Sequence, residues 1–147
     1  MKKELLAYTA GLIDADGYIS IIPRSGKYRK GYTPVVKLAA VDNITIDFLL
    51  KNFNGYTHIR SFESNAKDAT CWELKNKKPV SEFLIKIRKY LRLKKGRADL
   101  VIEYCETPFK QVHPWSKDYD PEVVERRHAI YKSLKNLNHR GKATRRD

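Results

Sequence analysis

"TAGLIDADG", residues 9–17, lies where a predicted helix over about residues 3–15 meets a predicted strand over about residues 18–28. Gly17 is a residue type that commonly ends a helix. Asp14 and Asp16 therefore fall in the last turn of the helix, where the helix dipole disfavours carboxylates. Two acids at an unfavourable position indicate a role other than stabilising the helix.

The rest of the chain repeats this alternation of helix and strand patterns. After the first strand we predict a strand, a helix, two strands and three helices, over residues 31–41, 42–55, 56–62, 70–75, 79–91, 94–108 and 120–137. Asp42 or Asn43 and Asp120 are predicted N-caps, and Pro79 is predicted to open its helix. The order predicts an α+β fold, α-β-β-α-β-β-α, with a four-stranded antiparallel saddle sheet, helices on one face and extra C-terminal helices.

Length and charge limit the function classes. The 147 residues fit one domain, which we place at residues 1–137 and follow with a basic, flexible tail at 138–147. Thirty Lys and Arg against 17 Asp and Glu give a net charge of +13, which favours a nucleic acid as partner over a membrane surface. The two cysteines and the lack of a signal peptide or apolar span predict an intracellular protein that is not secreted.

One sheet face must be solvated or bind a partner, because the helices cover the other. Alternation along the strands places Ile19, Ile21, Val36 and Leu38 in the core. A solvated face fits the pattern nearly as well, but the net charge favours DNA binding. The residues predicted to bind DNA are Ser20, Ile22, Arg24, Tyr28, Arg29, Lys30, Thr33, Val35, Lys37, Ala39, His58, Arg60, Phe62, Cys71, Glu73 and Lys75.

The paired acids fit a divalent cation. Carboxylate oxygens with a backbone carbonyl nearby suit Mg²⁺, which binds through one or two carboxylates plus a substrate phosphate. A calcium loop does not fit, because Tyr18 and Ser25 stand where it needs acidic ligands. The other interpretation is that an Asp binds backbone amides of the turn. Cys71, Cys105, His113 and His128 lack the spacing of a zinc site.

Residues 9–17 resemble the signature of the LAGLIDADG homing endonucleases, from which they differ only by Thr9 in place of Leu. The predicted order of elements is similar to that family's fold over about 100 residues. The motif occurs once, and the resemblance then implies a homodimer. It further implies that the motif helices of two subunits pack together at a two-fold axis, through the small residues Ala7, Ala10 and Gly11.

The resemblance also implies roles for individual residues. Asp16 matches the family's metal ligand, and Ala15 would offer its backbone carbonyl to the metal. Lys94 matches a basic residue near the scissile phosphate, although it also fits a solvated lysine-rich run. Asp42 stands where the family often has a polar residue that orients water, and it fits a helix N-cap equally well.

The sequence therefore predicts a homodimeric, site-specific double-strand DNA endonuclease. The resemblance implies hydrolysis of phosphodiester bonds with Mg²⁺, or with Mn²⁺ as a substitute, on a long pseudo-palindromic target. It also implies short 3′ overhangs, an intron-encoded origin and intron homing. Two alternatives on the same fold are an RNA-binding intron maturase and a DNA-binding regulator without catalysis. The presence of both Asp16 and Lys94 favours the nuclease.

Overall fold

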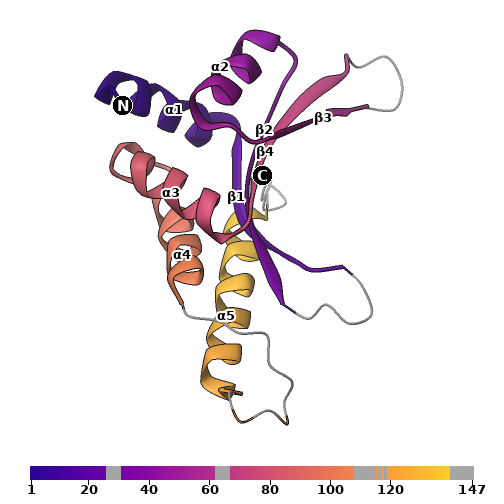
Figure 1. Ribbon diagram of the computed structural model, residues 1–147, viewed down its shortest axis with the longest axis vertical. Coiled ribbons are helices and arrows are strands. Elements are labelled where there is room, and N and C mark those ends of the chain that lie inside the picture. Colours follow the sequence, from indigo (N-terminus) through magenta and orange to yellow (C-terminus); the bar gives the residue numbers. More distant parts are fainter. Residues whose placement is uncertain (26–30, 62–66, 108–114, 116, 118, 140–147) are drawn as a thin grey trace, which may run out of the picture.

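The elements of the chain follow the predicted order (Figure 1). The computed structural model describes residues 1–147 except 26–30, 62–66, 108–114, 116, 118 and 140–147. The elements are α1 (Lys3–Asp16), β1 (Gly17–Pro23), β2 (Tyr32–Ala40), α2 (Asn43–Phe53), β3 (Tyr56–Arg60), β4 (Ala69–Lys75), α3 (Lys77–Ile87), the 3-10 turn η1 (Arg88–Tyr90), α4 (Lys95–Glu106) and α5 (Pro121–Asn138). The α+β prediction is confirmed.

The four strands form one antiparallel sheet in the order β1-β2-β4-β3. The inner strands β2 and β4 pair with each other, which brings the second hairpin against the first. The helices gather on one side of the sheet, while the two hairpins diverge on the other side (Figure 1). We call the side without helices the open face.

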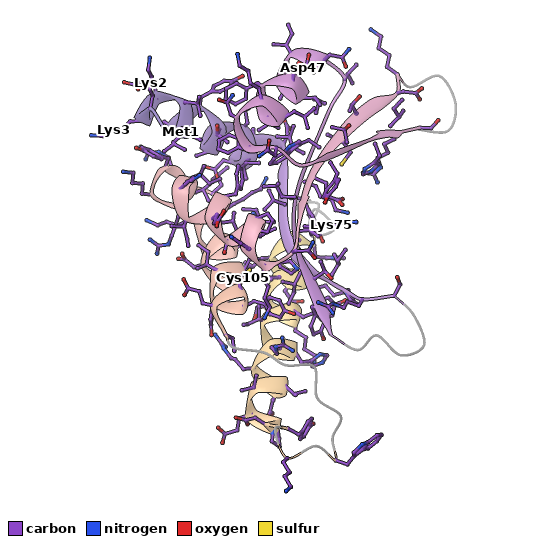
Figure 2. All side chains as sticks on the ribbon, viewed as in Figure 1. Met1, Lys2, Lys3, Asp47, Lys75 and Cys105 are labelled. Atoms are coloured by element: carbon purple, nitrogen blue, oxygen red, sulfur yellow. The ribbon has the colours of Figure 1, made fainter. Side chains whose placement is uncertain are left out.

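The hydrophobic core lies between the sheet and the helices. Ile19 and Val36 are completely buried there, as their alternation along the strands predicts, and so is Trp72 of β4. The Trp72 ring packs against Phe83 of α3, and its Nε1–H donates to the carbonyl of Asn54 at 2.6 Å. Cys105 of α4 lies between that helix and the sheet (Figure 2) and packs against the same core.

Helix starts follow the predicted caps in two cases and differ in a third. The Asp42 and Asp120 carboxylates accept backbone N–H bonds from Thr45 and Glu122, which confirms both as N-caps. The prediction that Pro79 opens its helix is wrong, because α3 already begins at Lys77. Asn76 precedes α3 in the left-handed region, with φ of 77°, and this turn lets the helix start directly after β4.

The last helix closes the edge of the sheet at β1. The side-chain amide of Asn138 donates a hydrogen bond to the carbonyl oxygen of Ile19 at 2.9 Å. The end of α5 therefore satisfies a backbone carbonyl that the edge strand β1 would otherwise leave unpaired. The proposed tail at 138–147 lies almost entirely outside the described residues. Within the described part of the chain, no helix has the length and apolar character needed to cross a membrane.

Candidate functional site

The junction between α1 and β1 is tight enough to require glycine. The Gly17 N–H donates to the carbonyl of Ile13 and ends the helix. A Cβ atom at position 17 would lie 2.8 Å from both the Cα and the carbonyl oxygen of Ile13. Backbone cannot move aside as a side chain can, so β1 leaves α1 directly after Asp16 only with glycine at this position.

Asp14 is fully engaged in holding a loop from a distant part of the chain. Its two carboxylate oxygens accept the backbone N–H groups of Arg92 at 2.7 Å and of Lys94 at 2.9 Å. Bonds from backbone N–H groups to a carboxylate are among the stronger protein hydrogen bonds. Asp14 therefore fits the second interpretation of the sequence, an acid that binds backbone amides.

Lys94 lies at the end of the motif helix, as its predicted role requires. Its Nζ donates to the carbonyl of Ile13 at 2.8 Å and to that of Gly17 at 2.6 Å. Burial lowers the pKa of the amine and nearby Arg97 adds to this, while Asp14 and Asp16 act in the opposite direction. An ammonium has three N–H groups, so one remains for a group at the end of α1.

Asp16 differs from Asp14 in having an exposed carboxylate. Within the described residues, nothing donates a hydrogen bond or forms an ion pair with it. Ala15, whose carbonyl is predicted to assist, is also exposed. An unengaged carboxylate at the carbonyl end of a helix is a donor set of hard oxygens, which suits Mg²⁺. The described part of the chain groups no three His, Cys, Asp or Glu residues into a metal site of its own.

Asp42 serves as the N-cap of α2. Its carboxylate accepts the Thr45 N–H at 2.7 Å, and this bond holds the pKa of Asp42 below its usual value. The cap explains why an acid stands at the end of β2 without any catalytic role. Orientation of water by Asp42 stays a prediction.

The outer face of α1 carries exposed small residues. Ala7, Gly11 and Ala15 are exposed and recur at helical spacing. A Cβ added at Gly11 would meet nothing within 4 Å in the same chain, so the fold itself does not require glycine there. Ala10 needs a correction: it is completely buried in its own core, so its side chain is not available to a partner subunit.

Strand pairing places the predicted DNA-binding positions of all four strands on the open face. Ser20 pairs with Val35, Ile22 with Thr33, and Lys37 with Glu73, and directly paired residues share a face. The same face carries Ala39, His58, Arg60, Cys71 and Lys75. Lys75 points away from the helix layer in Figure 2.

Four of these positions are less accessible than predicted. Ser20, Val35, Cys71 and Glu73 are each at least 95% buried. Val35, Cys71 and Glu73 belong to the inner strands, which have neighbours on both sides, and Ser20 lies beside the end of α5. Contact with a partner therefore falls to the longer side chains that rise above them.

Arg24 follows the end of β1. Its N–H donates to the Gly31 carbonyl at 2.9 Å, so the pairing of the hairpin continues one residue past Pro23. Burial lowers the pKa values of Lys77 and Arg127, that of Arg127 to about 10, and the positive charge of Arg24 adds to the lowering of both. Contact of Arg24 with DNA stays a prediction. Tyr28, Arg29, Lys30 and Phe62 lie outside the described residues.

Two tyrosines on the open face were missed by the sequence-based selection. Tyr18 pairs with Lys37, and Tyr56 pairs with Glu73. Their side chains are 40% and 67% exposed. The alternation that selected Ser20 and His58 includes both, so the sequence carried the signal.

Glu73 stands at the centre of the open face between two lysines. Its carboxylate lies 3.1 Å from the Nζ of Lys37 on β2 and 2.8 Å from the Nζ of Lys75 on its own strand. Burial alone would raise the pKa of Glu73, but the two lysines more than offset this and lower it. The carboxylate therefore stays ionised beneath the two ammonium groups.

Solved structures to which this chain is similar include homing endonucleases. The structure of I-CvuI in complex with a DNA target superposes with a TM-score of 0.68 and 19% sequence identity, over 95% of this chain and 85% of that chain. The archaeal intron-encoded homing endonuclease I-Vdi141I, complexed with DNA, superposes with a TM-score of 0.71 and 14% sequence identity, over 92% of this chain and 85% of that chain. The LAGLIDADG homing endonuclease I-GzeII, in complex with a DNA target, superposes with a TM-score of 0.67 and 18% sequence identity, over 89% of this chain and 47% of that chain.

Comparisons of the sequence alone give no such match. No family model matches the chain, and no curated protein matches it. The motif at residues 9–17 nevertheless occupies the last turns of α1 and the turn into β1. With this motif at the junction and this sheet beside it, the chain has the fold of the LAGLIDADG homing endonucleases.

Proposed function

We propose that this chain is one subunit of a homodimeric, site-specific DNA endonuclease that depends on a divalent metal. The observation that carries the proposal is the contrast at the end of α1. Asp14 and Lys94 are fixed by short hydrogen bonds, whereas the Asp16 carboxylate beside them is exposed and has no described donor. An acid kept bare at a helix C-terminus is stabilised when a cation binds there.

Asp16 and the carbonyl of Ala15 would hold the metal. Complexes of the neighbour I-CvuI with DNA were crystallised in the presence of Ca, and in the presence of 2 mM Mg with the DNA not cleaved, which supports a divalent metal at this site. Mg²⁺ is the ion that we propose, and Mn²⁺ is the substitute to test. Bound Mg²⁺ would stabilise the negative charge that develops on the phosphate during hydrolysis.

The residues of the chain itself would position and neutralise the scissile phosphate. Lys94 is tethered by two carbonyls, so its ammonium is held at the end of α1 and its remaining N–H can donate to a phosphate oxygen. Because Lys94 is already in place before DNA binds, little reorganisation would be needed during the reaction. Asp14 fixes the loop that carries Lys94.

A second copy of the chain would complete the site. Each chain supplies one Asp16, and cutting both strands takes two such acids. The exposed Ala7, Gly11 and Ala15 would allow two α1 helices to approach closely, and their C-terminal ends would then meet. The chain covers 85% of I-CvuI but 47% of I-GzeII, which agrees with a single-motif subunit.

The open faces of the two subunits would bind the DNA on either side of the cut. Lys37, Arg60 and Lys75 supply positive charge there, and all three neighbours named above are complexes with DNA. Strands of seven to nine residues, as in β1, β2 and β4, span roughly 23–30 Å, which is most of one turn of duplex. A two-fold dimer would cover about 20 bp with partial palindromy.

The direct test maps cleavage on genomic DNA that lacks the intron, in Mg²⁺ and in EDTA, by sequencing the ends produced. We expect cuts at one or a few sites, with short 3′ overhangs, in Mg²⁺ alone. An insertion site for an intron at the cut would support intron homing. A protein that binds duplex DNA yet leaves it intact in Mg²⁺ and Mn²⁺ would instead be a regulator, and preference for intron RNA would indicate a maturase.

A further inference from the structure

We propose that Glu73 is a specificity-determining residue that keeps Lys37 and Lys75 from binding DNA phosphates indiscriminately. This inference rests on the proposed function, because it concerns the DNA-binding face. It adds a role for an acid on a surface that is otherwise basic, and it follows from the arrangement of three side chains.

The position of Glu73 suits a control point. β4 is an inner strand, and Glu73 pairs across to Lys37 on β2 and to Tyr56 on β3, while Lys75 follows two residues later on the same face. The Glu73 side chain is 6% exposed, whereas those of Lys37 and Lys75 are 33% and 46% exposed. The acid therefore lies beneath two ammonium groups that remain accessible.

This arrangement changes what the lysines can do. A lysine has a long flexible side chain and acts as a mobile point charge, so on a DNA-binding face it reaches the nearest phosphate. Phosphate contacts raise affinity for every sequence and carry no sequence information, whereas contacts with base edges discriminate. Glu73 holds both ammonium groups over the centre of the open face, which in the proposed binding mode would face a groove of the duplex.

Glu73 also reduces the charge available for unspecific binding. The three side chains together carry one positive charge instead of two. A phosphate that recruits either lysine must draw it away from a buried carboxylate, and a buried carboxylate that loses a partner is strongly unfavourable. A base acceptor within reach of the tethered ammonium groups demands no such separation, so the competition favours sequence-dependent contacts.

The test compares Glu73→Gln with Glu103→Gln. Gln keeps the shape and removes the charge at position 73. Glu103 pairs with Arg126 in the helix layer, so its replacement makes the same change in net charge away from the open face. Binding to a random-sequence duplex is measured at several salt concentrations, and sequence preference is measured by enrichment from a randomised duplex library, with all proteins shown to be folded.

We expect Glu73→Gln to bind the random duplex more tightly and with a steeper salt dependence. A slope steeper by about 0.9 per subunit corresponds to one additional phosphate neutralised by a lysine. Enrichment of preferred sequences should fall several-fold, and Glu103→Gln should match the parent in both assays. Glu73→Asp, which keeps the charge but is too short to reach both lysines, should give an intermediate result if the glutamine variant folds poorly.

Several outcomes would overturn the inference. Identical slopes and enrichment for Glu73→Gln and the parent would show that the acid has only a structural role. Equal changes in salt dependence and enrichment for Glu73→Gln and Glu103→Gln would show that the effect comes from net charge and not from the position of Glu73. These results leave the proposed function intact if the parent binds and discriminates. A parent that does not bind duplex DNA at all would overturn the proposed function and this inference together.

Discussion

The junction at the end of α1 and the centre of the open face both place acids where the chain approaches its proposed substrate, but they treat them differently. On the open face, Glu73 is buried and paired with two lysines. At the junction, Asp14 is bound by two backbone N–H groups and Asp16 is left bare. An acid with its donors supplied by the protein organises other groups, whereas an acid without them is available to a ligand.

Asp16→Asn should separate the two acids of the junction most clearly. The substitution removes a metal-binding charge to which no described residue donates a hydrogen bond, so cleavage should fall by orders of magnitude in Mg²⁺ while the binding of duplex DNA remains. In EDTA the variant should melt at the same temperature as the parent or higher, since the helix dipole disfavours the acid. A variant that melts several degrees lower and still cuts would make Asp16 a structural residue like Asp14.

Asp14→Ala should have the opposite signature. It leaves the N–H groups of Arg92 and Lys94 without their carboxylate, and the free energy of unfolding should fall by about 2–4 kcal/mol. Asp14→Asn keeps one oxygen acceptor and should lose about half as much. Urea unfolding of the two variants measures the loss of stability. An unchanged unfolding midpoint for Asp14→Ala would contradict the structural role that separates Asp14 from Asp16.

Gly17→Ala and Gly11→Ala compare the two glycines of α1 and its end. At position 17 the new Cβ would lie 2.8 Å from backbone atoms of Ile13, so stability should fall by about 1–3 kcal/mol. At position 11 the new Cβ meets nothing, so the isolated chain should gain about 0.5–1 kcal/mol from helix propensity. The same methyl would lie in the proposed interface, and sedimentation should show a weaker dimer. Equal effects of both substitutions on stability would contradict this account.

The smallest expected effect is the change in the free energy of unfolding with pH that comes from Glu73. Its pKa is lowered in the folded state from an ordinary value near 4.5, because Lys75 and Lys37 outweigh burial. The resulting stabilisation is fully present above that value and is lost as pH falls through the folded pKa. The stability difference between the parent and Glu73→Gln should therefore shrink below pH 4.5, measured by urea unfolding. A difference that stays constant would show that the ion pairs do not stabilise the fold.

Much of the fold could be predicted from the sequence because its signals are local. Alternation determined the faces of β1 to β4, and Asp42 and Asp120 were recognisable caps. The start of α3 was misplaced because Pro79 is a strong local signal, whereas the turn at Asn76 depends on a left-handed residue that the sequence does not mark.

The site was only partly predictable because its contacts are distant in sequence. Asp14 binds Arg92 and Lys94, which lie 78 and 80 positions away, and no periodicity connects them. Ala10 and Gly11 are adjacent small residues, so composition could not tell which one faces the core. Contact of Arg24 with DNA stays a prediction, because β1 ends at Pro23 and only the backbone bond from Arg24 to Gly31 continues the hairpin.

The central claim is that two copies of Asp16, one from each subunit, together cut both strands. The direct measurement mixes differently tagged parent and Asp16→Asn chains, purifies the mixed dimer through both tags, and adds it in Mg²⁺ to supercoiled plasmid carrying the mapped site. The account predicts nicked circular plasmid, because one subunit still cuts its strand. Linear plasmid from the mixed dimer would contradict it.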